Sequence, residues 1–151
     1  KKKKKCSQQS NKQKRTLMTL PNTDELIENF GFFDDWEERY AYLIDLGDQV
    51  PPMDEALKND INYVKGCTSK VWMVGHFNDD KLQLIADSDA KIVRGLVAIL
   101  MGVYGGKTKT EIRSVNIQDV FGQLGLEGHL SPSRRNGFYA MVQRIEVLAQ
   151  S

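Results

Sequence analysis

KVWMVGHFNDDKLQLIA, residues 70–86, is the stretch that decides the fold. Valine and aromatic residues dominate its first half, and its second half places leucine, leucine and alanine at every second position. These patterns predict strands over residues 70–77 and 81–86, joined by a hairpin turn at residues 78–80. Residues 62–64 read as a further short strand. Three consecutive short strands with tight links predict a small three-stranded antiparallel sheet.

Helical spacing of apolar residues is found on both sides of this sheet. Capping signals predict that helices begin at residues 21–23, at a capping box of Asp34 with Glu37, at Ser88 or Asp89, at a second box of Thr108 with Glu111, at Asn116, and at Ser131-Pro132. Gly47 and Gly105-Gly106 predict helix ends. Trp72 and the apolar stripes of the helices are predicted to form the core. Helices, then strands, then helices is the order of an α+β domain, in which helices flank the sheet.

One domain is predicted over residues 20–151, with no internal repeat and no second domain. No apolar run approaches the roughly 18 residues that a membrane helix needs. The basic N-terminus is not followed by the apolar segment of a secretory signal. A cytoplasmic protein with no membrane partner is therefore expected.

Charge is distributed unevenly along the chain. Eight of the 21 lysine and arginine residues lie within residues 1–19, which contain no acid. The remainder therefore carries 13 cations against 20 anions, a net charge of −7. A duplex-binding domain carries positive charge on its folded surface, so no nucleic-acid partner is expected, and a basic patch on a protein partner fits better. Residues 1–19 are polar and lysine-rich, which predicts a disordered leader or added sequence rather than an arm that binds nucleic acid or a membrane.

The chain has two cysteines, Cys6 in the N-terminal segment and Cys67 in the body. Two cysteines so placed make no disulfide framework. Cys67, His76 and His129 are too few ligands for a structural zinc site. The glycines form no phosphate-binding or dinucleotide-binding loop. No metal site and no cofactor are therefore expected, and the free thiol of Cys67 is the candidate reactive group.

Cys67 follows Gly66 in a turn over residues 65–68. A glycine at this place permits a tight or left-handed backbone and the close approach of a partner. Ser69 can donate a hydrogen bond, and the N–H groups of a tight turn favour the thiolate, which is the nucleophile in sulfur exchange. A small buried apolar side chain is the other reading of such a cysteine, and spacing alone leaves both open. A hydrolytic cysteine would need a histidine base, for which His129 is a candidate.

Four segments together form a pattern that is more specific than any one motif. Residues 66–72 read GCTSKVW, residues 88–96 read SDAKIVRGL, residues 129–137 read HLSPSRRNG, and residues 36–40 read WEERY. In this order and spacing they resemble the signatures of the SufE family, the sulfur-acceptor partners of cysteine desulfurases. The resemblance extends from about Leu20 to the C-terminus, which is hard to obtain by chance.

The resemblance implies a function. SufE proteins take sulfur from the persulfide that a pyridoxal-phosphate-dependent cysteine desulfurase, of the SufS or CsdA type, makes from L-cysteine. They stimulate that enzyme and pass the sulfur toward a scaffold protein of iron–sulfur cluster assembly. Cys67 would then carry the persulfide, and pyridoxal phosphate would belong to the partner. The implied fold is a small antiparallel sheet with flanking helices, shared with IscU-type scaffolds. Such a chain is an accessory protein rather than a stand-alone enzyme.

The resemblance also implies roles for residues around the reactive cysteine. Gly66 is the candidate hinge of the cysteine loop, and Ser69 belongs to the same loop. Asp89 stabilises the resting loop, or else is a plain helix cap. Arg134 and His129 help to dock the partner or to steady the docked loop, or else are an ordinary solvated arginine and loop histidine. The alternative function is an adaptor or scaffold that binds and regulates the desulfurase without carrying sulfur.

Overall fold

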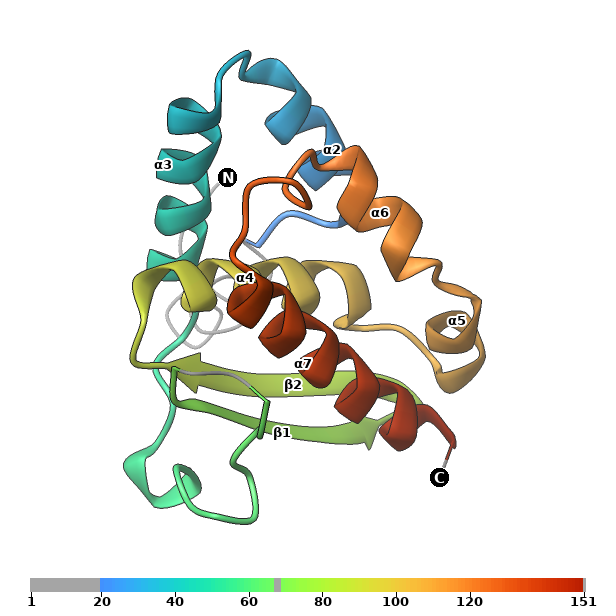
Figure 1. Cartoon of the computed structure of the whole chain (residues 1–151). Helices are drawn as coiled ribbons and strands as arrows, with labels where there is room; N and C mark the ends of the chain where they lie inside the picture. Colours follow the sequence, from blue (N-terminus) through green and yellow to red (C-terminus); the bar gives the residue numbers. More distant parts are fainter. Residues whose placement is uncertain (1–19, 67–68, 151) are drawn as a thin grey trace, which may run out of the picture.

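The computed structural model describes residues 20–66 and 69–150. The predictions for residues 1–19 and for Cys67 lie outside the described residues. Helices precede and follow one β-hairpin (Figure 1), which confirms the α+β class. The elements in chain order are α2 Thr23–Phe32, α3 Trp36–Asp48, a 3-10 helix η1 Glu55–Leu57, β1 Val71–Asn78, β2 Lys81–Ser88, α4 Lys91–Tyr104, α5 Lys109–Ser114, α6 Ile117–Gln123 and α7 Pro132–Gln150.

The β-hairpin forms where the alternation of the sequence predicts it. Strands β1 and β2 pair in antiparallel register over their full length, and Asn78 opposite Lys81 is the last pair before the turn. The two residues of the turn, Asp79 and Asp80, have φ angles of 53° and 66°. Positive φ at both central residues is the geometry of a type I′ hairpin turn, whose twist matches that of the strands. The short side chain of aspartate tolerates this backbone conformation.

The sheet has two strands in the described part of the chain, so the prediction of a third strand over residues 62–64 is wrong. Of these three residues only Tyr63 pairs with β1, in an isolated bridge opposite Trp72. The pairing extends no further because the chain turns on both sides of it. The Tyr63 N–H donates to the Asp60 carbonyl at 3.3 Å, and Gly66 has a φ of 104°.

The two faces of the hairpin have different environments because side chains alternate along a strand. One face is buried on the side where α4 and α7 lie (Figure 1). Its residues are Val71, Met73, Leu82, Leu84 and Ala86. Trp72 lies on the opposite face and is half-buried, so its prediction as a core residue is wrong. The Lys58 ammonium lies 5.5 Å from the Trp72 ring centroid, and the Tyr63 ring lies at 6.3 Å.

Several helices begin at the caps that the sequence predicts. Asn22 and Glu25 form a reciprocal capping box at the start of α2, and Thr108 and Glu111 form another at the start of α5. In each box the cap side chain accepts from a backbone N–H of the first turn, and the glutamate accepts from the backbone N–H of the cap. Asn116 caps α6 through its side chain. Local sequence therefore sets these helix starts.

Two other helix starts differ from the prediction. α3 begins one residue late, because Asp35 rather than Asp34 provides its N-cap. α4 has Ala90 as its N-cap residue, and no side chain bonds to its first turn, so neither Ser88 nor Asp89 caps it. Ser88 instead accepts from the Ala90 N–H in the turn before the helix. Asp89 bonds to Lys70, in the loop that precedes β1.

α3 and α4 contact each other closely at two glycines. α3 ends at Asp48, one residue after the predicted stop at Gly47, and Gly47 itself is helical and buried. A Cβ atom built on Gly47 would lie 2.8 Å from the backbone nitrogen of Gly95 in α4. One built on Gly95 would lie 2.7 Å from Cγ of Leu43. These glycines therefore set the distance at which the two helices meet.

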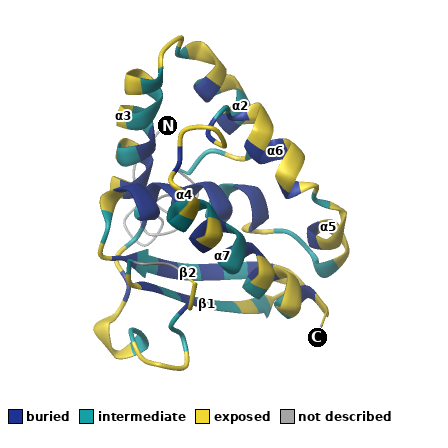
Figure 2. Cartoon of the chain, in the orientation of Figure 1, coloured by how far each residue is buried: buried dark blue, intermediate teal, exposed yellow. Residues whose placement is uncertain are grey.

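α4 lies at the centre of the hydrophobic core (Figure 2). Its buried residues include the predicted apolar stripe, Ile92, Val93, Leu96, Val97, Leu100 and Val103. α7 buries most of its own predicted stripe, Phe138, Met141, Val142 and Ile145, whereas Leu148 is only partly buried. In the described part of the chain, no helix combines the length and the apolar content needed to cross a membrane.

Candidate functional site

The loop of residues 65–70, called the cysteine loop from here on, is closed at its base by the backbone. The Val64 N–H donates to the Val71 carbonyl at 2.8 Å, so the loop connects the isolated bridge to β1. Among its described residues, Gly66 is exposed and Ser69 is half-buried. The φ of 104° at Gly66 is one that residues with a side chain rarely adopt. Glycine is therefore required for this backbone conformation.

Asp89 holds the downstream end of the cysteine loop. Its Oδ1 accepts from the Lys70 N–H at 3.0 Å, and its own N–H donates to the Lys70 carbonyl at 3.2 Å. Its carboxylate thus bonds to the loop rather than to the first turn of α4, which removes the reading of Asp89 as a plain helix cap. A hydrogen bond to an ionised acceptor is stronger than one between neutral groups.

We expect Asp89→Ala to free the Lys70 amide. A hydrogen bond to a charged group contributes about 1.5 kcal/mol, and exposure to solvent reduces this contribution. The opening that exposes the Lys70 amide should become more favourable. The hydrogen exchange rate of this amide, measured by NMR, should therefore rise about threefold. Asp89→Asn is the matched control, because its amide oxygen can still accept the bond. Unchanged exchange in Asp89→Ala would show that the bond does not protect Lys70.

The upstream end of the cysteine loop lies against α7, a contact that no motif in the sequence indicates. Arg144 donates from its two terminal nitrogens to the carbonyls of Ile61 and Tyr63, the latter at 2.9 Å. A Cβ atom built on Gly66 would lie 3.4 Å from Cβ of Ala140, one helical turn before Arg144. The partners of Arg144 are 81 and 83 residues away in the chain, and no local pattern signals such a pairing.

Asp87, near the end of β2, pairs with Lys58 in the segment before the cysteine loop and with Arg94 in α4. Its carboxylate lies 3.1 Å from Nζ of Lys58 and 3.2 Å from Nε of Arg94. Lys58 also pairs with Glu55 at 2.9 Å. The hydrogen bonds that Lys58 donates to Glu55 and to Asp87 raise its pKa above the ordinary value. Because Lys58 also lies over Trp72, these contacts hold the segment that leads toward the cysteine loop on the outer face of the sheet.

His129 and Arg134 lie at the N-terminal end of α7. His129 is exposed and stacks on Trp36, with ring centroids 4.3 Å apart and an interplanar angle of 13°. Arg134 is half-buried, and its backbone N–H donates to Oγ of Ser131 at 3.2 Å. Within the described residues its guanidinium forms no ion pair. The segment that contains both residues therefore contacts the start of α3.

These residues lie before Ala140, the point at which α7 meets Gly66, whereas the C-terminal end of α7 packs beside Gly75 of β1. An α-helix rises about 1.5 Å per residue, so Arg134 lies about 9 Å along the axis from Ala140, the neighbour of Gly66. The structure thus gathers one group of the predicted site residues at the cysteine loop and places another group at the N-terminal end of α7. The first group is Gly66, Ser69 and Asp89, and the second is His129 and Arg134.

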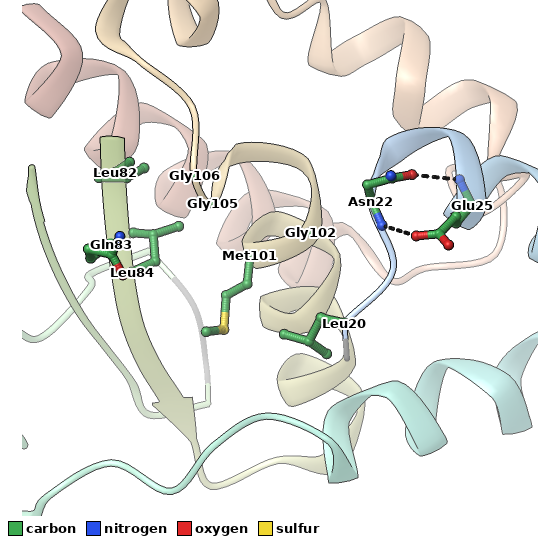
Figure 3. A pocket seen from close by; sticks show the side chains of 10 residues that line it. All are labelled: Leu20, Asn22, Glu25, Leu82, Gln83, Leu84, Met101, Gly102, Gly105 and Gly106. Atoms are coloured by element: carbon green, nitrogen blue, oxygen red, sulfur yellow. Dashed lines mark hydrogen bonds between the residues drawn. The ribbon is translucent and has the colours of Figure 1, made fainter. Parts of the chain in front are cut away.

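The structure also has a pocket of about 470 Å³, whose lining residues are drawn in Figure 3. Its lining includes the start of α2, part of β2, Met101 and Gly102 near the end of α4, and Gly105 and Gly106 after it. Asp89 precedes the other end of α4, whose 14 residues span about 21 Å. Asn22 and Glu25 in the lining are bonded to each other in the cap of α2. Residues 20–66 and 69–150 contain no group of three His, Cys, Asp or Glu side chains that could hold a metal ion.

The sequence matches a known family over most of its length. The family described as SufE, Fe-S metabolism associated domain, matches residues 24–149. An uncharacterized SufE-like protein of Rhizobium meliloti (strain 1021) is 42% identical over 135 residues, which cover 87% of this chain and 96% of that protein. A SufE-like protein of Rhizobium etli is 42% identical over 130 residues, which cover 83% of this chain and 88% of that protein.

The fold is similar to that of a solved structure. The solution structure of a hypothetical protein from Thermus thermophilus matches with a TM-score of 0.69, over 85% of this chain and 93% of that chain. The two sequences are 20% identical, so this likeness shows a common fold alone. The family match and the two relatives at 42% identity show more: the chain belongs to the SufE family, which is associated with iron–sulfur metabolism.

Proposed function

We propose that the chain accepts persulfide sulfur on Cys67 from a pyridoxal-phosphate-dependent cysteine desulfurase. It stimulates that enzyme and passes the sulfur to a scaffold protein of iron–sulfur cluster assembly. Membership of the SufE family supports the general role in sulfur transfer. The motif GCTSKVW at residues 66–72 supports Cys67 as the acceptor.

The observation that carries this proposal is the way in which the cysteine loop is attached to the protein. On its upstream side Tyr63 is bonded to Arg144, and on its downstream side Lys70 is bonded to Asp89. Between these points Gly66 is exposed, with a backbone conformation reserved for glycine. A reactive loop that must reach a partner needs fixed ends and a flexible point between them.

The proposed step is an exchange between a thiolate and a persulfide. The Cys67 thiolate attacks the outer sulfur of the partner's persulfide, and a new S–S bond forms at Cys67. The S–S bond of the partner breaks, and its cysteine leaves as a thiolate. No electrons are gained or lost overall, so this chain needs no redox cofactor for the step. Pyridoxal phosphate acts in the desulfurase, where the persulfide is made from L-cysteine.

Neighbouring residues take supporting roles in this proposal. Gly66 is the hinge about which the loop turns toward the partner, and Asp89 holds the resting loop. Ser69 donates a hydrogen bond that favours the thiolate form of the cysteine. Arg134 and His129, at the N-terminal end of α7, contact the docked desulfurase. The acidic charge of the chain after residue 19 supports docking to a basic patch of that partner.

Intact-protein mass spectrometry tests the proposal after incubation with a cysteine desulfurase and L-cysteine. The wild-type chain and Cys6→Ser are expected to gain sulfur, and Cys67→Ser is expected to gain none. A reaction without L-cysteine is the control for sulfur carried over from other sources. A gain that persists in Cys67→Ser and is lost in Cys6→Ser would refute the assignment of the acceptor.

Two other functions make different predictions. An adaptor that binds and regulates the desulfurase would stimulate it without Cys67, whereas a carrier would not. A cysteine hydrolase that uses His129 would turn over substrate without a desulfurase. His129 stacks on Trp36 at the start of α3, and this contact gives the hydrolase no support.

A further inference from the structure

Arg144 lies beside residues 61–63, on the side of this segment that faces away from β1. Carbonyl groups of a paired extended chain point alternately to its two sides. The Asn62 carbonyl accepts from the Met73 N–H of β1 at 2.8 Å. The carbonyls on either side of it, those of Ile61 and Tyr63, accept from the two terminal nitrogens of Arg144. A planar guanidinium can bond two such acceptors at once, which the ammonium of a lysine does not match.

α7 does not depend on Arg144 for its own position. The helix is anchored in the core by a set of buried side chains. They are Phe138, Met141, Val142, Ile145 and Ala149. Arg144 itself is half-buried, and its two hydrogen bonds go to the segment before the cysteine loop. The arginine therefore holds that segment on the helix, rather than the helix on the core.

The same face of α7 continues toward the cysteine loop. Ala140 and Arg144 are four residues apart, so they lie on one face of the helix. A Cβ atom built on Gly66 would lie 3.4 Å from Cβ of Ala140. Residues 61–66 thus run along this face as far as the residue that precedes Cys67, and Arg144 holds them three residues before Gly66.

We propose that Arg144 is a positioning residue for sulfur transfer. It fixes the direction in which the chain enters the cysteine loop and touches no reacting atom. This inference rests on the proposed function, because the position of the loop matters for transfer only if Cys67 is the acceptor. A displacement of about 1 Å far from the chemistry can cost about 100-fold in rate. Loss of the two hydrogen bonds, with α7 still in place, should slow transfer about tenfold.

The test measures single-turnover transfer from a persulfide-loaded desulfurase to the chain, over a range of chain concentrations. Arg144→Gln is expected to lower the maximal transfer rate about tenfold. The chain concentration that gives the half-maximal rate should change little. Arg144→Lys should fall between Arg144→Gln and wild type, because an ammonium reaches one carbonyl and not both. Arg113→Gln is the matched control. Arg113 also donates to a backbone carbonyl, that of Ala149 at 2.8 Å, but it does so away from the cysteine loop.

Hydrogen exchange of the Val64 amide gives a second measurement that needs no desulfurase. That amide bonds to Val71 at the base of the loop and should exchange faster in Arg144→Gln than in Arg113→Gln. Faster exchange with a lower maximal rate supports the positioning role. Faster exchange with a wild-type maximal rate would overturn it, since Arg144 would then only brace the segment. A wild-type chain that gains no sulfur would refute the proposed function itself, whereas a wild-type rate in Arg144→Gln refutes only this inference.

Discussion

Cys67→Ser is expected to leave a cysteine desulfurase at the rate that it shows without an acceptor. An acceptor speeds turnover by removing the sulfur from the partner's cysteine, which regenerates the thiolate for the next cycle. A serine hydroxyl stays protonated at neutral pH and forms no persulfide, so the variant cannot remove that sulfur. The measurement is the rate of alanine production from L-cysteine as the concentration of the chain is raised. Wild type should raise this rate to a plateau, and Cys67→Ser should not raise it.

The controls for this experiment separate a carrier from an adaptor. Cys6→Ser should stimulate as wild type does, because Cys6 lies in the lysine-rich segment outside the matched family region. Cys67→Ser should still bind the desulfurase in a calorimetric titration, since serine differs from cysteine by one atom. Full stimulation by Cys67→Ser would reject the carrier and establish the adaptor. Binding without stimulation, together with sulfur gain in wild type only, is the result that a carrier requires.

The parts of the fold that could be predicted from the sequence are those that depend on neighbouring residues. The hairpin follows from the valine and aromatic residues over 70–77, from alternation over 81–86 and from two aspartates that tolerate positive φ. The capping boxes at Asn22 and Thr108 follow from glutamates three residues later. Each of these features is complete within one short segment, so its signal is visible without knowledge of the rest of the chain.

The errors arose where distant residues decide the structure. Residues 62–64 have a strand-like composition, but turns at Asp60 and Gly66 limit their pairing to Tyr63. Gly47 lies one residue before the end of α3, but the sequence did not show that it also meets Gly95, 48 residues later in the chain. A local pattern cannot distinguish a glycine that ends a helix from one that lets another helix approach.

The candidate site shows the same division. The motifs identified Gly66 and Ser69 in the cysteine loop and Asp89, which bonds to that loop, but they left two readings of Asp89 open. Only the hydrogen bonds between Asp89 and Lys70 decide between the cap and the loop contact. Arg144 was missed altogether because its hydrogen bonds depend on how α7 lies against residues 61–66.

Gly95→Ala is expected to lower the free energy of unfolding by about 2 kcal/mol. A Cβ atom at this position would lie 2.7 Å from Cγ and 2.9 Å from Cδ1 of Leu43, and it would also contact the Leu43 carbonyl oxygen. A backbone oxygen cannot rotate away, so α3 and α4 must move apart. Such overpacking costs about 3 kcal/mol, and the better helix propensity of alanine recovers about 1 kcal/mol. In urea unfolding the midpoint should fall, and in thermal unfolding Tm should drop by about 6 °C.

Gly31→Ala is the matched control, because Gly31 also lies in a helix and nothing lies within 4 Å of a Cβ built on it. The same change should leave stability unaltered or raise it by up to about 1 kcal/mol. A loss of stability in Gly95→Ala together with a gain in Gly31→Ala would show that the loss comes from the contact between α3 and α4, and not from the change in backbone freedom. If Gly95→Ala were as stable as Gly31→Ala, close contact at Gly95 would not set the spacing of α3 and α4. Since α4 begins two residues after Asp89, a real shift of α4 should also speed hydrogen exchange of the Lys70 amide, and this would link helix packing to the cysteine loop.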